Sequence, residues 1–142
     1  MDPSEARVIA VVMGGVCGER SVSIQTGTCV IFNLLKSGHK VRPVCIHADG
    51  EWEIGAPPSD EFTLEGCFSG KGQSALSALA RLLELEVDCV FNALHGPGGE
   101  DGIIQGFLRQ SGIPFTGPDV TPAAVTMDKA LTKAVLQDAG IR

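Results

Sequence analysis

The sequence predicts a three-layer α/β domain with a mainly parallel sheet. Three observations lead to this fold class. Apolar, β-branched runs at residues 7–13 and 87–94 have the composition of parallel strands that are buried on both faces. Each run is followed by a glycine-rich loop and then by apolar residues at helical spacing. Strands and helices alternate along the chain, and domains of this kind carry their functional sites at the carboxyl ends of the strands.

The first strand is expected at residues 7–13 and the first helix at residues 22–36. Ser21 or Ser23 is placed to cap this helix, because a serine hydroxyl accepts hydrogen bonds from the free N–H groups of a first turn. Gly38 is the expected stop, since glycine readily adopts the left-handed conformation that ends many helices.

The next strand, at residues 40–47, contains Pro43, which cannot donate a ladder hydrogen bond. We therefore expect this strand at an edge or in an outer position of the sheet. Asp49-Gly50 predicts a hairpin tip, after which the chain continues away from the sheet. Residues 55–72 contain two adjacent prolines, several glycines and little periodicity, and they predict a long surface loop.

Helical spacing returns at residues 74–85, with Ser74 as the cap, and a short link leads into the strand at residues 87–94. A second glycine-rich loop follows, and the helix after it is expected to end at Gly112. The apolar face of that helix is predicted from Ile103, Ile104, Phe107, Leu108 and Ser111, and the opposite face from Gln105, Arg109 and Gln110.

The last part of the chain is predicted to be helical. Residues 113–117 predict a short strand, and Thr121-Pro122 opens a helix with proline at its first position. Met127-Asp128 leads into a final helical segment on which Lys129 and Lys133 share one face. The buried side of this segment is predicted from Leu131, Val135 and Leu136.

Size and composition fit one domain. We expect it to occupy residues 1–120, with a helical connection over residues 121–142. No apolar segment approaches the roughly 20 residues that a membrane-spanning helix needs. The net charge of −6 argues against a nucleic-acid partner, because such partners require a basic surface.

The five cysteines are evenly spaced and never form the close pairs of metal or redox motifs. They predict free thiols and no metal site. Cys29, Cys45 and Cys89 stand in apolar stretches, where we expect them to act as small hydrophobes. The first seven residues carry no apolar run of a secretory leader, so a reducing, cytoplasmic location is expected.

The loop at residues 14–18 is rich in glycine, but it matches neither of the common phosphate-binding patterns. Its glycines are mis-spaced for a dinucleotide fingerprint, and no Gly-Lys-Ser/Thr follows as in a P-loop. Glu19 would repel phosphate and attract an ammonium group, or it pairs with Arg20 at the start of the helix. Cys17 has no activating base nearby, so an incidental cysteine is favoured over a nucleophile.

The stretch that begins at His95 is the second candidate site. A histidine at a strand end can donate a proton or hydrogen-bond an anion, or it can bond the loop backbone as a structural residue. Glu100 and Asp101 stand where carboxylates favour a helix start. Lys129 and Lys133 form either a phosphate-binding pair or a solvated helix face, and helical spacing of charges favours the second.

Four motifs in this order resemble the D-alanine–D-alanine ligase family of ATP-grasp enzymes. They are Gly14-Gly-Val-Cys-Gly-Glu-Arg-Ser-Val-Ser23, Asn92-Ala-Leu-His-Gly-Pro-Gly-Gly-Glu-Asp-Gly-Ile-Ile-Gln-Gly106, Pro114-Phe-Thr-Gly117 and Met127-Asp-Lys-Ala-Leu-Thr-Lys133. The resemblance implies a Rossmann-like (pre-ATP-grasp) fold and ATP-dependent synthesis of the D-alanyl-D-alanine dipeptide for peptidoglycan. Ser21 departs from the family, which usually carries glutamate there.

The resemblance also implies roles for single residues. Glu19 matches a glutamate that holds the ammonium group of the first D-alanine, and Ser23 matches a serine that supports the substrate loop. His95 matches a histidine beside the first substrate and the developing acyl phosphate, and Lys129 matches a lysine that reaches the ATP phosphates. ATP and Mg²⁺ are implied as cofactors, D-alanine as the substrate and a homodimer as the assembly.

Members of the family are longer, and their further ATP-grasp domains bind most of the ATP and Mg²⁺. The resemblance is therefore to the N-terminal substrate domain, and we expect this chain alone to have no ligase activity. An alternative is a stand-alone small-molecule binding module that kept Glu19 and His95. A generic nucleotide-binding domain is disfavoured by the absent fingerprint.

Overall fold

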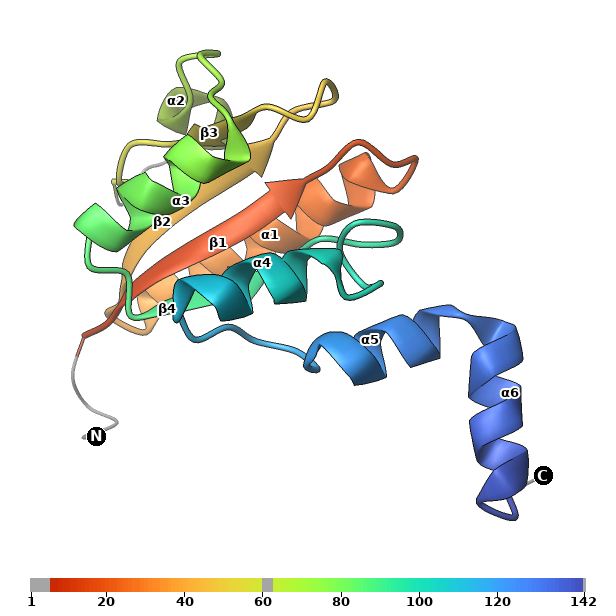
Figure 1. Ribbon diagram of the computed structural model, residues 1–142. Coiled ribbons are helices and arrows are strands. Elements are labelled where there is room, and N and C mark those ends of the chain that lie inside the picture. Colours follow the sequence, from red (N-terminus) through yellow and green to blue (C-terminus); the bar gives the residue numbers. More distant parts are fainter. Residues whose placement is uncertain (1–5, 60–62, 142) are drawn as a thin grey trace.

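The sheet of the computed structural model, which describes residues 6–59 and 63–141, has four strands (Figure 1). They are β1 (Val8–Gly14), β2 (Lys40–Ile46), β3 (Trp52–Ile54) and β4 (Cys89–Asn92), in the spatial order β3-β2-β1-β4. β1 is parallel to both β2 and β4, whereas β3 is antiparallel to β2. The carboxyl ends of the three parallel strands therefore meet at one edge of the sheet.

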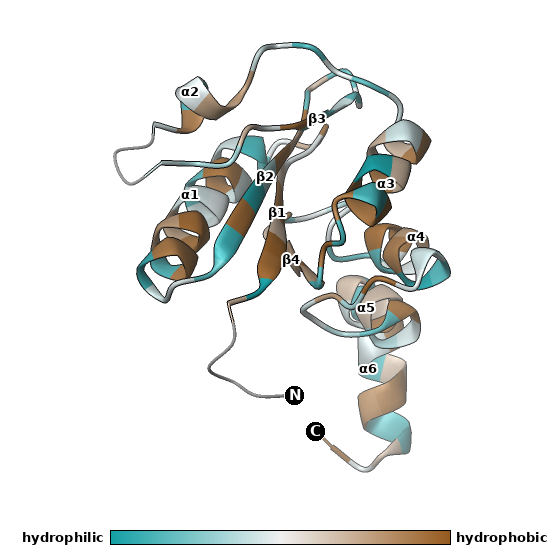
Figure 2. Cartoon of the chain, turned by 90° about the vertical axis from the view of Figure 1, so that its left-hand side faces the viewer, coloured by the Kyte–Doolittle hydropathy of each residue, from teal (hydrophilic) through white to brown (hydrophobic). Residues whose placement is uncertain are grey.

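Helices cover both faces of the sheet and complete three layers. α1 (Arg20–Lys36) lies on one face, and α3 (Ala75–Glu84) and α4 (Ile103–Ser111) lie on the other (Figure 2). The predicted three-layer α/β fold with a mainly parallel sheet is confirmed.

The central strand β1 contributes to both cores because successive side chains of a strand point to opposite faces. Val11 and Met13 belong to the core that includes residues of α1, while Ala10 and Val12 belong to the core beneath α3 and α4. All four are fully buried, and burying each valine or methionine contributes about 1.5–3 kcal/mol. A Cβ atom on Gly27 would lie 2.7 Å from the sulfur of Met13, so glycine lets α1 approach the sheet closely.

β2 lies inside the sheet, and the expectation from Pro43 of an edge position is wrong. β3 covers its outer side through pairs such as Val44↔Ile54. Pro43 lies just beyond these pairs, where its carbonyl accepts a hydrogen bond from the N–H of Gly55 (2.8 Å). The proline nitrogen, which has no proton to donate, therefore faces the end of the three-residue strand β3. At most one hydrogen bond of the ladder is lost in this way.

The hairpin tip at Asp49-Gly50 is confirmed by the hydrogen bond from the Gly50 N–H to the His47 carbonyl (3.1 Å). The chain does not leave the sheet after the tip, as was expected, but returns as β3, because Trp52 packs into the core. The stretch after β3 is mostly loop and contains the one-turn helix α2 (Leu64–Cys67). Residues 60–62 of this stretch lie outside the described residues.

Neither serine proposed as the cap of α1 performs that function. The chain turns into the helix earlier, through a hydrogen bond from the Arg20 N–H to the Cys17 carbonyl, so the N-cap position falls on Glu19. Ser21 is exposed on the first turn, and Ser23 is buried. Gly38 has the positive φ (+81°) expected of a helix stop.

The cap at Ser74 and the stop at Gly112 are confirmed, because the Ser74 hydroxyl accepts from the Ser77 N–H and Gly112 is left-handed. The predicted faces of α4 are partly wrong. Ile103 is 68% exposed and Gln105 is 1% exposed. A loop carbonyl compensates the burial of the Gln105 amide, as described below.

Two helices follow α4 in the described chain, as expected. They are α5 (Val120–Met127) and α6 (Lys129–Asp138), and the carboxylates of Asp119 and Asp128 cap them. Because Asp119 is the cap, Pro122 is the third residue of α5 and not the first. Residues 113–117 form a single bridge to β4 and no strand of their own.

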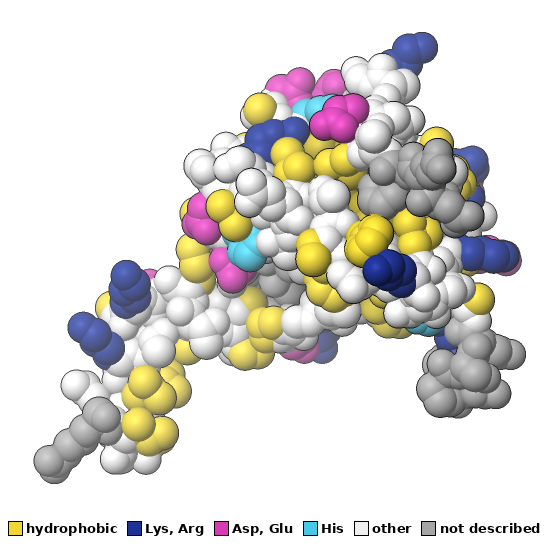
Figure 3. Space-filling view, turned by 180° about the vertical axis from the view of Figure 1, so that it is seen from behind, with side chains coloured by type: hydrophobic (Ala, Val, Ile, Leu, Met, Phe, Trp, Pro, Cys, Tyr) yellow, Lys and Arg dark blue, Asp and Glu magenta, His cyan; other side chains and the backbone are white. Residues whose placement is uncertain are grey.

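α6 projects from the body of the molecule (Figure 1), and hydrophobic side chains lie open on the projecting arm (Figure 3). Its expected buried side is wrong, because Leu131, Val135 and Leu136 are all exposed. Cys29 is exposed as well, since it lies on the outer side of α1, while Cys45 is buried and all five cysteines are free thiols. Among the described residues no helix is long and apolar enough to cross a membrane.

Candidate functional site

Two glycine-rich loops lie together at the carboxyl edge of the sheet. The first loop (residues 14–18) follows β1, and the second loop (residues 95–101) follows β4, the neighbour of β1. The two loops line one small pocket of about 80 Å³, to which the first contributes Gly14, Gly15 and Val16 and the second contributes His95, Pro97, Gly98 and Gly99. The strand order thus joins the two candidates that the sequence singled out.

Glu19 faces the second loop. A Cβ atom on Gly96 would lie 2.5 Å from Oε1 of Glu19, so the carboxylate rests against the backbone of that glycine. Gly96 also has a positive φ (+65°), and only glycine satisfies both conditions without strain. The Glu19 side chain is exposed and forms no ion pair with Arg20 in the described part of the chain. Its charge is therefore free for a cationic group.

Arg20 points away from Glu19 and holds the first loop to the end of β2. Its guanidinium donates to the carbonyl oxygens of Gly15 (3.2 Å) and Ile46, and it contacts the sulfur of Cys45. Sequence reasoning considered Arg20 only as a partner for Glu19. Its partners are two backbone carbonyls and the Cys45 sulfur near the ends of β1 and β2, which no local motif identifies.

Ser23 joins the ends of β1 and β4. Its hydroxyl accepts from the Gly14 N–H (2.9 Å) and donates to the Ala93 carbonyl (2.8 Å), and the side chain is fully buried. Each loop leaves the sheet at one of these two backbone groups. The hydroxyl therefore fixes the distance between the two loops.

His95 follows β4 and is half-buried. Its Nε2 lies 3.0 Å from the hydroxyl oxygen of Thr26, and its carbonyl accepts a hydrogen bond from the thiol of Cys17 (3.2 Å). The Cys17 thiol is thus engaged with backbone, in agreement with an incidental cysteine. Thr26 was missed by sequence reasoning, although it lies one helical turn after Ser23 and so on the same side of α1.

The second loop is braced by its own carboxylates. Glu100 accepts a hydrogen bond from the Gly96 N–H (2.7 Å), and Asp101 accepts from the Gly98 N–H (2.7 Å). Asp101 also accepts from the first helical N–H of α4, at Ile103 (3.1 Å), which agrees with its expected place at a helix start. These bonds hold the loop in one conformation without using the His95 side chain.

A larger cavity of about 400 Å³ lies on the other side of His95. The Gly99 carbonyl stands at its wall and accepts from the amides of Asn92 and Gln105, both at 2.9 Å. The Gln105 carbonyl oxygen is buried and has no hydrogen-bond partner among the described residues. Thr26 and Thr116 add hydroxyl groups to the lining, so the wall is rich in polar groups close to His95.

Lys129 lies apart from this edge, as the exposed first residue of the projecting helix α6. The structure brings together Glu19, Ser23 and His95, whereas no hydrogen bond or ion pair of the described residues connects Lys129 to them. Within residues 6–59 and 63–141, no group of three or more histidine, cysteine, aspartate or glutamate side chains could hold a metal ion.

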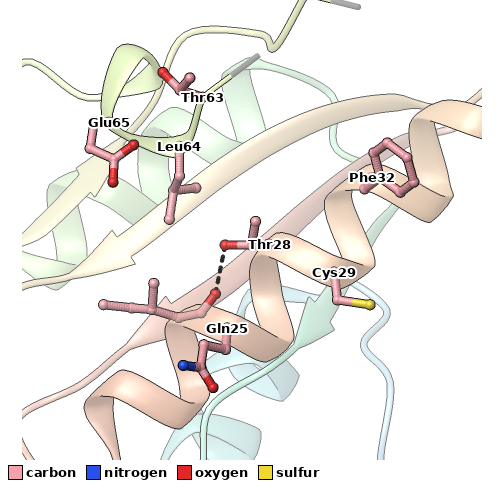
Figure 4. A pocket seen from close by; sticks show the side chains of 8 residues that line it. Gln25, Thr28, Cys29, Phe32, Thr63, Leu64 and Glu65 are labelled. Atoms are coloured by element: carbon pink, nitrogen blue, oxygen red, sulfur yellow. Dashed lines mark hydrogen bonds between the residues drawn. The ribbon is translucent and has the colours of Figure 1, made fainter. Parts of the chain in front are cut away.

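A further groove of about 600 Å³ lies away from the strand ends, between α1 and α2 (Figure 4). Cys29 and Phe32 line it from α1 and Leu64 lines it from α2, with Glu65 as its charged residue. Its lining contains no group of the strand-end site.

Comparisons with known proteins identify relatives of this arrangement. The sequence model of the family described as "D-ala D-ala ligase N-terminus" matches residues 8–118. A D-alanine–D-alanine ligase of Deinococcus radiodurans is 42% identical over 95% of this chain and 39% of its own length. The vancomycin/teicoplanin A-type resistance protein VanA of Enterococcus faecium is 35% identical over 94% of this chain and 41% of its own length.

Two solved structures have a similar fold. The D-alanine–D-alanine ligase of Coxiella burnetii superposes with a TM-score of 0.75 at 27% identity, over 96% of this chain and 42% of that chain. A Bacillus anthracis ligase complexed with ATP gives a TM-score of 0.65 at 31% identity, over 95% of this chain and 37% of that chain. The chain thus spans about two fifths of the length of the relatives it matches.

Proposed function

The chain belongs to the D-alanine–D-alanine ligase family, matching its N-terminal domain, and we therefore propose that it forms the first substrate-binding part of an ATP-dependent ligase that joins two D-alanine molecules. One observation supports this proposal most strongly. The Glu19 carboxylate lies against Gly96 with no cationic partner among the described residues, beside the pocket that the two loops share. A small amino acid bound there would place its ammonium group at Glu19.

The other residues of the edge fit the remaining groups of that substrate. With the ammonium group at Glu19, the substrate carboxylate would extend towards His95, whose imidazole can donate a hydrogen bond to an anionic oxygen. Ser23 does not touch the substrate in this proposal. It holds the two loops at the spacing that allows Glu19 and His95 to act on one small molecule.

ATP, when bound, supplies the phosphoryl group that activates the carboxylate of the first D-alanine, and the amine of a second D-alanine then displaces phosphate to form the peptide bond. Lys129 is exposed and can offer one cation to a phosphate group, which adds electrostatic stabilisation to the transfer. The described residues offer no acidic cluster for Mg²⁺. We therefore propose that most contacts to ATP and to Mg²⁺ lie outside this chain.

A titration with D-alanine tests the site. Amide resonances at residues 14–19 and 95–99 are expected to shift with D-alanine and to shift much less with L-alanine. Glu19→Gln should weaken binding by about fivefold, because an ion pair at a solvated surface contributes about 1 kcal/mol. Glu65→Gln, on α2 and outside the site, should bind like the wild type. Equal binding by Glu19→Gln and the wild type would contradict the proposal.

The same proposal predicts that the chain alone does not turn over. A coupled assay with D-alanine, ATP and Mg²⁺ should detect no ADP release above background, and sustained turnover would contradict this. The homodimer expected from the resemblance and the cytoplasmic location expected from the cysteines and the first residues belong to the proposal as well. Sedimentation of the purified chain tests the first, and fractionation of cells tests the second.

A further inference from the structure

The hydroxyl of Thr26, which lies inside α1, forms a hydrogen bond to a side chain outside its own helix. Thr28, two residues later, donates its hydroxyl proton to the carbonyl of Ile24 in its own helix at 2.8 Å (Figure 4). Thr126 on α5 does the same with the carbonyl of Pro122 in its own helix (2.8 Å). Thr26 makes no such bond. Among the described residues its hydroxyl has one partner, Nε2 of His95 at 3.0 Å.

The direction of this hydrogen bond follows from counting protons. A threonine hydroxyl has one proton to donate, and a neutral imidazole has one nitrogen that donates and one that accepts. If Nε2 carried the proton, the Thr26 hydroxyl would accept it and would keep its own proton without an acceptor in the described chain. If Nε2 is the acceptor, the hydroxyl proton is used and the imidazole proton lies on Nδ1.

Nδ1 of His95 is the ring nitrogen that remains available. It has no hydrogen-bond partner among the described residues. It is also not buried, because the Gln105 carbonyl oxygen is the one buried side-chain N or O atom of the described chain that lacks a partner. Two carboxylates contact the residue that follows His95: Glu19 rests against Gly96, and Glu100 accepts a hydrogen bond from the Gly96 N–H. Neither carboxylate forms a hydrogen bond to the ring.

We propose that Thr26 is a positioning residue that donates its hydroxyl proton to Nε2 of His95 and thereby holds the neutral imidazole with its proton on Nδ1. Nδ1–H is then the group that His95 offers to an anionic oxygen of the substrate. This last step rests on the proposed function, whereas the protonation pattern of the ring is a property of the chain itself. A second group commonly fixes the tautomer of a functional histidine in this way.

Nitrogen NMR of the chain labelled with ¹⁵N-histidine tests the inference directly. At about pH 8.5, where an ordinary histidine is neutral, His95 should show a protonated, pyrrole-type Nδ1 and an unprotonated, pyridine-type Nε2. His39 serves as the internal reference of opposite pattern, because its Nδ1 accepts the Arg7 N–H (3.2 Å). A His95→Gln variant assigns the signals.

Variants of Thr26 and Thr28 show whether Thr26 positions the His95 ring or only packs against it. Thr26→Val keeps the shape of the side chain and removes the hydroxyl, so the His95 pattern should move towards the form protonated on Nε2. Thr26→Ser should restore the wild-type pattern, and Thr28→Val should leave it unchanged. Unchanged His39 signals in each variant show that the fold is intact. A wild-type His95 protonated on Nε2, or a pattern that Thr26→Val does not alter, would overturn the inference.

A titration with D-alanine distinguishes this inference from the proposed function. Thr26→Val should bind D-alanine about three- to tenfold more weakly than Thr28→Val, the loss expected for one hydrogen bond that is no longer correctly oriented. If the wild type shows the expected tautomer but binds no D-alanine, the proposed function and the substrate step fail together while the role of Thr26 in holding the ring stands. If D-alanine binds and the tautomer is the opposite one, the inference alone fails.

Discussion

Backbone groups at the ends of β1 and β4 depend on one hydroxyl for their hydrogen bonds. The Gly14 N–H and the Ala93 carbonyl have Ser23 as their side-chain partner in the described chain, and the Ser23 side chain is fully buried. The serine that the resemblance assigns to the support of the substrate loop is therefore a structural link between the two strands.

Ser23→Ala is expected to lower the free energy of unfolding by about 2–4 kcal/mol, because it leaves one donor and one acceptor buried and unpaired. Chemical denaturation at neutral pH measures the change. Ser21→Ala is the control: this serine is exposed two residues earlier in the same helix, and its loss should cost less than about 0.5 kcal/mol. Similar stabilities of the two variants would contradict the structural role of Ser23.

Glu53 on β3 is a buried carboxylate outside the site. Burial by itself raises the pKa of Glu53, but hydrogen bonds from Ser69 and His47 outweigh this effect, and the net pKa lies below the ordinary value of 4.5. The bonds come from the Ser69 hydroxyl (2.8 Å), the Gly70 N–H (3.0 Å) and Nε2 of His47 (3.1 Å). They fasten the chain after α2 to the edge of the sheet.

A carboxyl whose pKa is lower in the folded state stabilises the fold above its unfolded pKa and loses this effect as the pH falls through its folded pKa. Glu53→Gln should therefore be less stable than the wild type by about 2 kcal/mol at pH 7. The gap should narrow progressively below pH 4.5, the ordinary value for this group. Urea titrations at several pH values measure the gap, with the exposed Glu51→Gln as the control. A constant gap from pH 7 to pH 3 would contradict the linkage.

At the scale of whole elements, α4 shows what periodicity can and cannot predict. The spacing of apolar residues predicted a helix that ends at Gly112, and the structure confirms it. The same spacing placed Ile103 inside and Gln105 outside, and the structure has them the other way round. The Gly99 carbonyl, which receives the Gln105 amide, lies in a loop whose conformation the helical pattern does not contain.

The start of α4 is fixed by contact with α5. Gly102 has a φ of +94°, and a Cβ atom there would lie 2.9 Å from the Val120 carbonyl oxygen. Gly112, at the other end of α4, is also left-handed (φ +76°) but faces open space. The two glycines therefore differ in their steric surroundings and share the backbone conformation that alanine resists.

Gly112→Ala is expected to cost about 1–2 kcal/mol of unfolding free energy, the penalty for a left-handed alanine. Gly102→Ala should cost at least about 1 kcal/mol more, because the added methyl group must displace backbone of α5. Thermal and chemical denaturation of both variants measure the difference. If Gly102→Ala were no worse than Gly112→Ala, α5 would not be packed tightly on α4.

At the scale of the whole molecule, the order of the strands brings most of the site residues together. Alternating strands and helices predicted a parallel sheet, and parallel neighbours place the ends of β1 and β4, and so Glu19 and His95, at one edge. Thr26 could not be found in that way, because its partner His95 lies 69 positions further along the chain and is reached only through the fold. The position of β2 was missed because the three-residue partner β3 gives no strand signal of its own.

α6 receives little stabilisation from packing against the rest of the described chain. α3 and α6 are both ten-residue helices, but α3 buries Ala78 and Leu82 completely, whereas α6 has no buried residue in the described chain. Isolated helices of this length are marginal in water, and tertiary packing supplies most of the stability of a short helix. The two helices should therefore differ sharply in local stability although their lengths are equal.

Hydrogen–deuterium exchange measures this difference. Amides of α6 are expected to exchange close to the rate of an unfolded peptide, because its Leu131 and Val135 are 51% and 54% exposed and opening the helix uncovers little further apolar surface. Amides of α3 should be protected at least about a hundredfold, since opening that helix exposes Leu82 and costs several kcal/mol. Protection of α6 equal to that of α3 would show that its exposed leucine and valine side chains are covered in solution, most simply by a second copy of the chain, and a concentration series would then reveal the association.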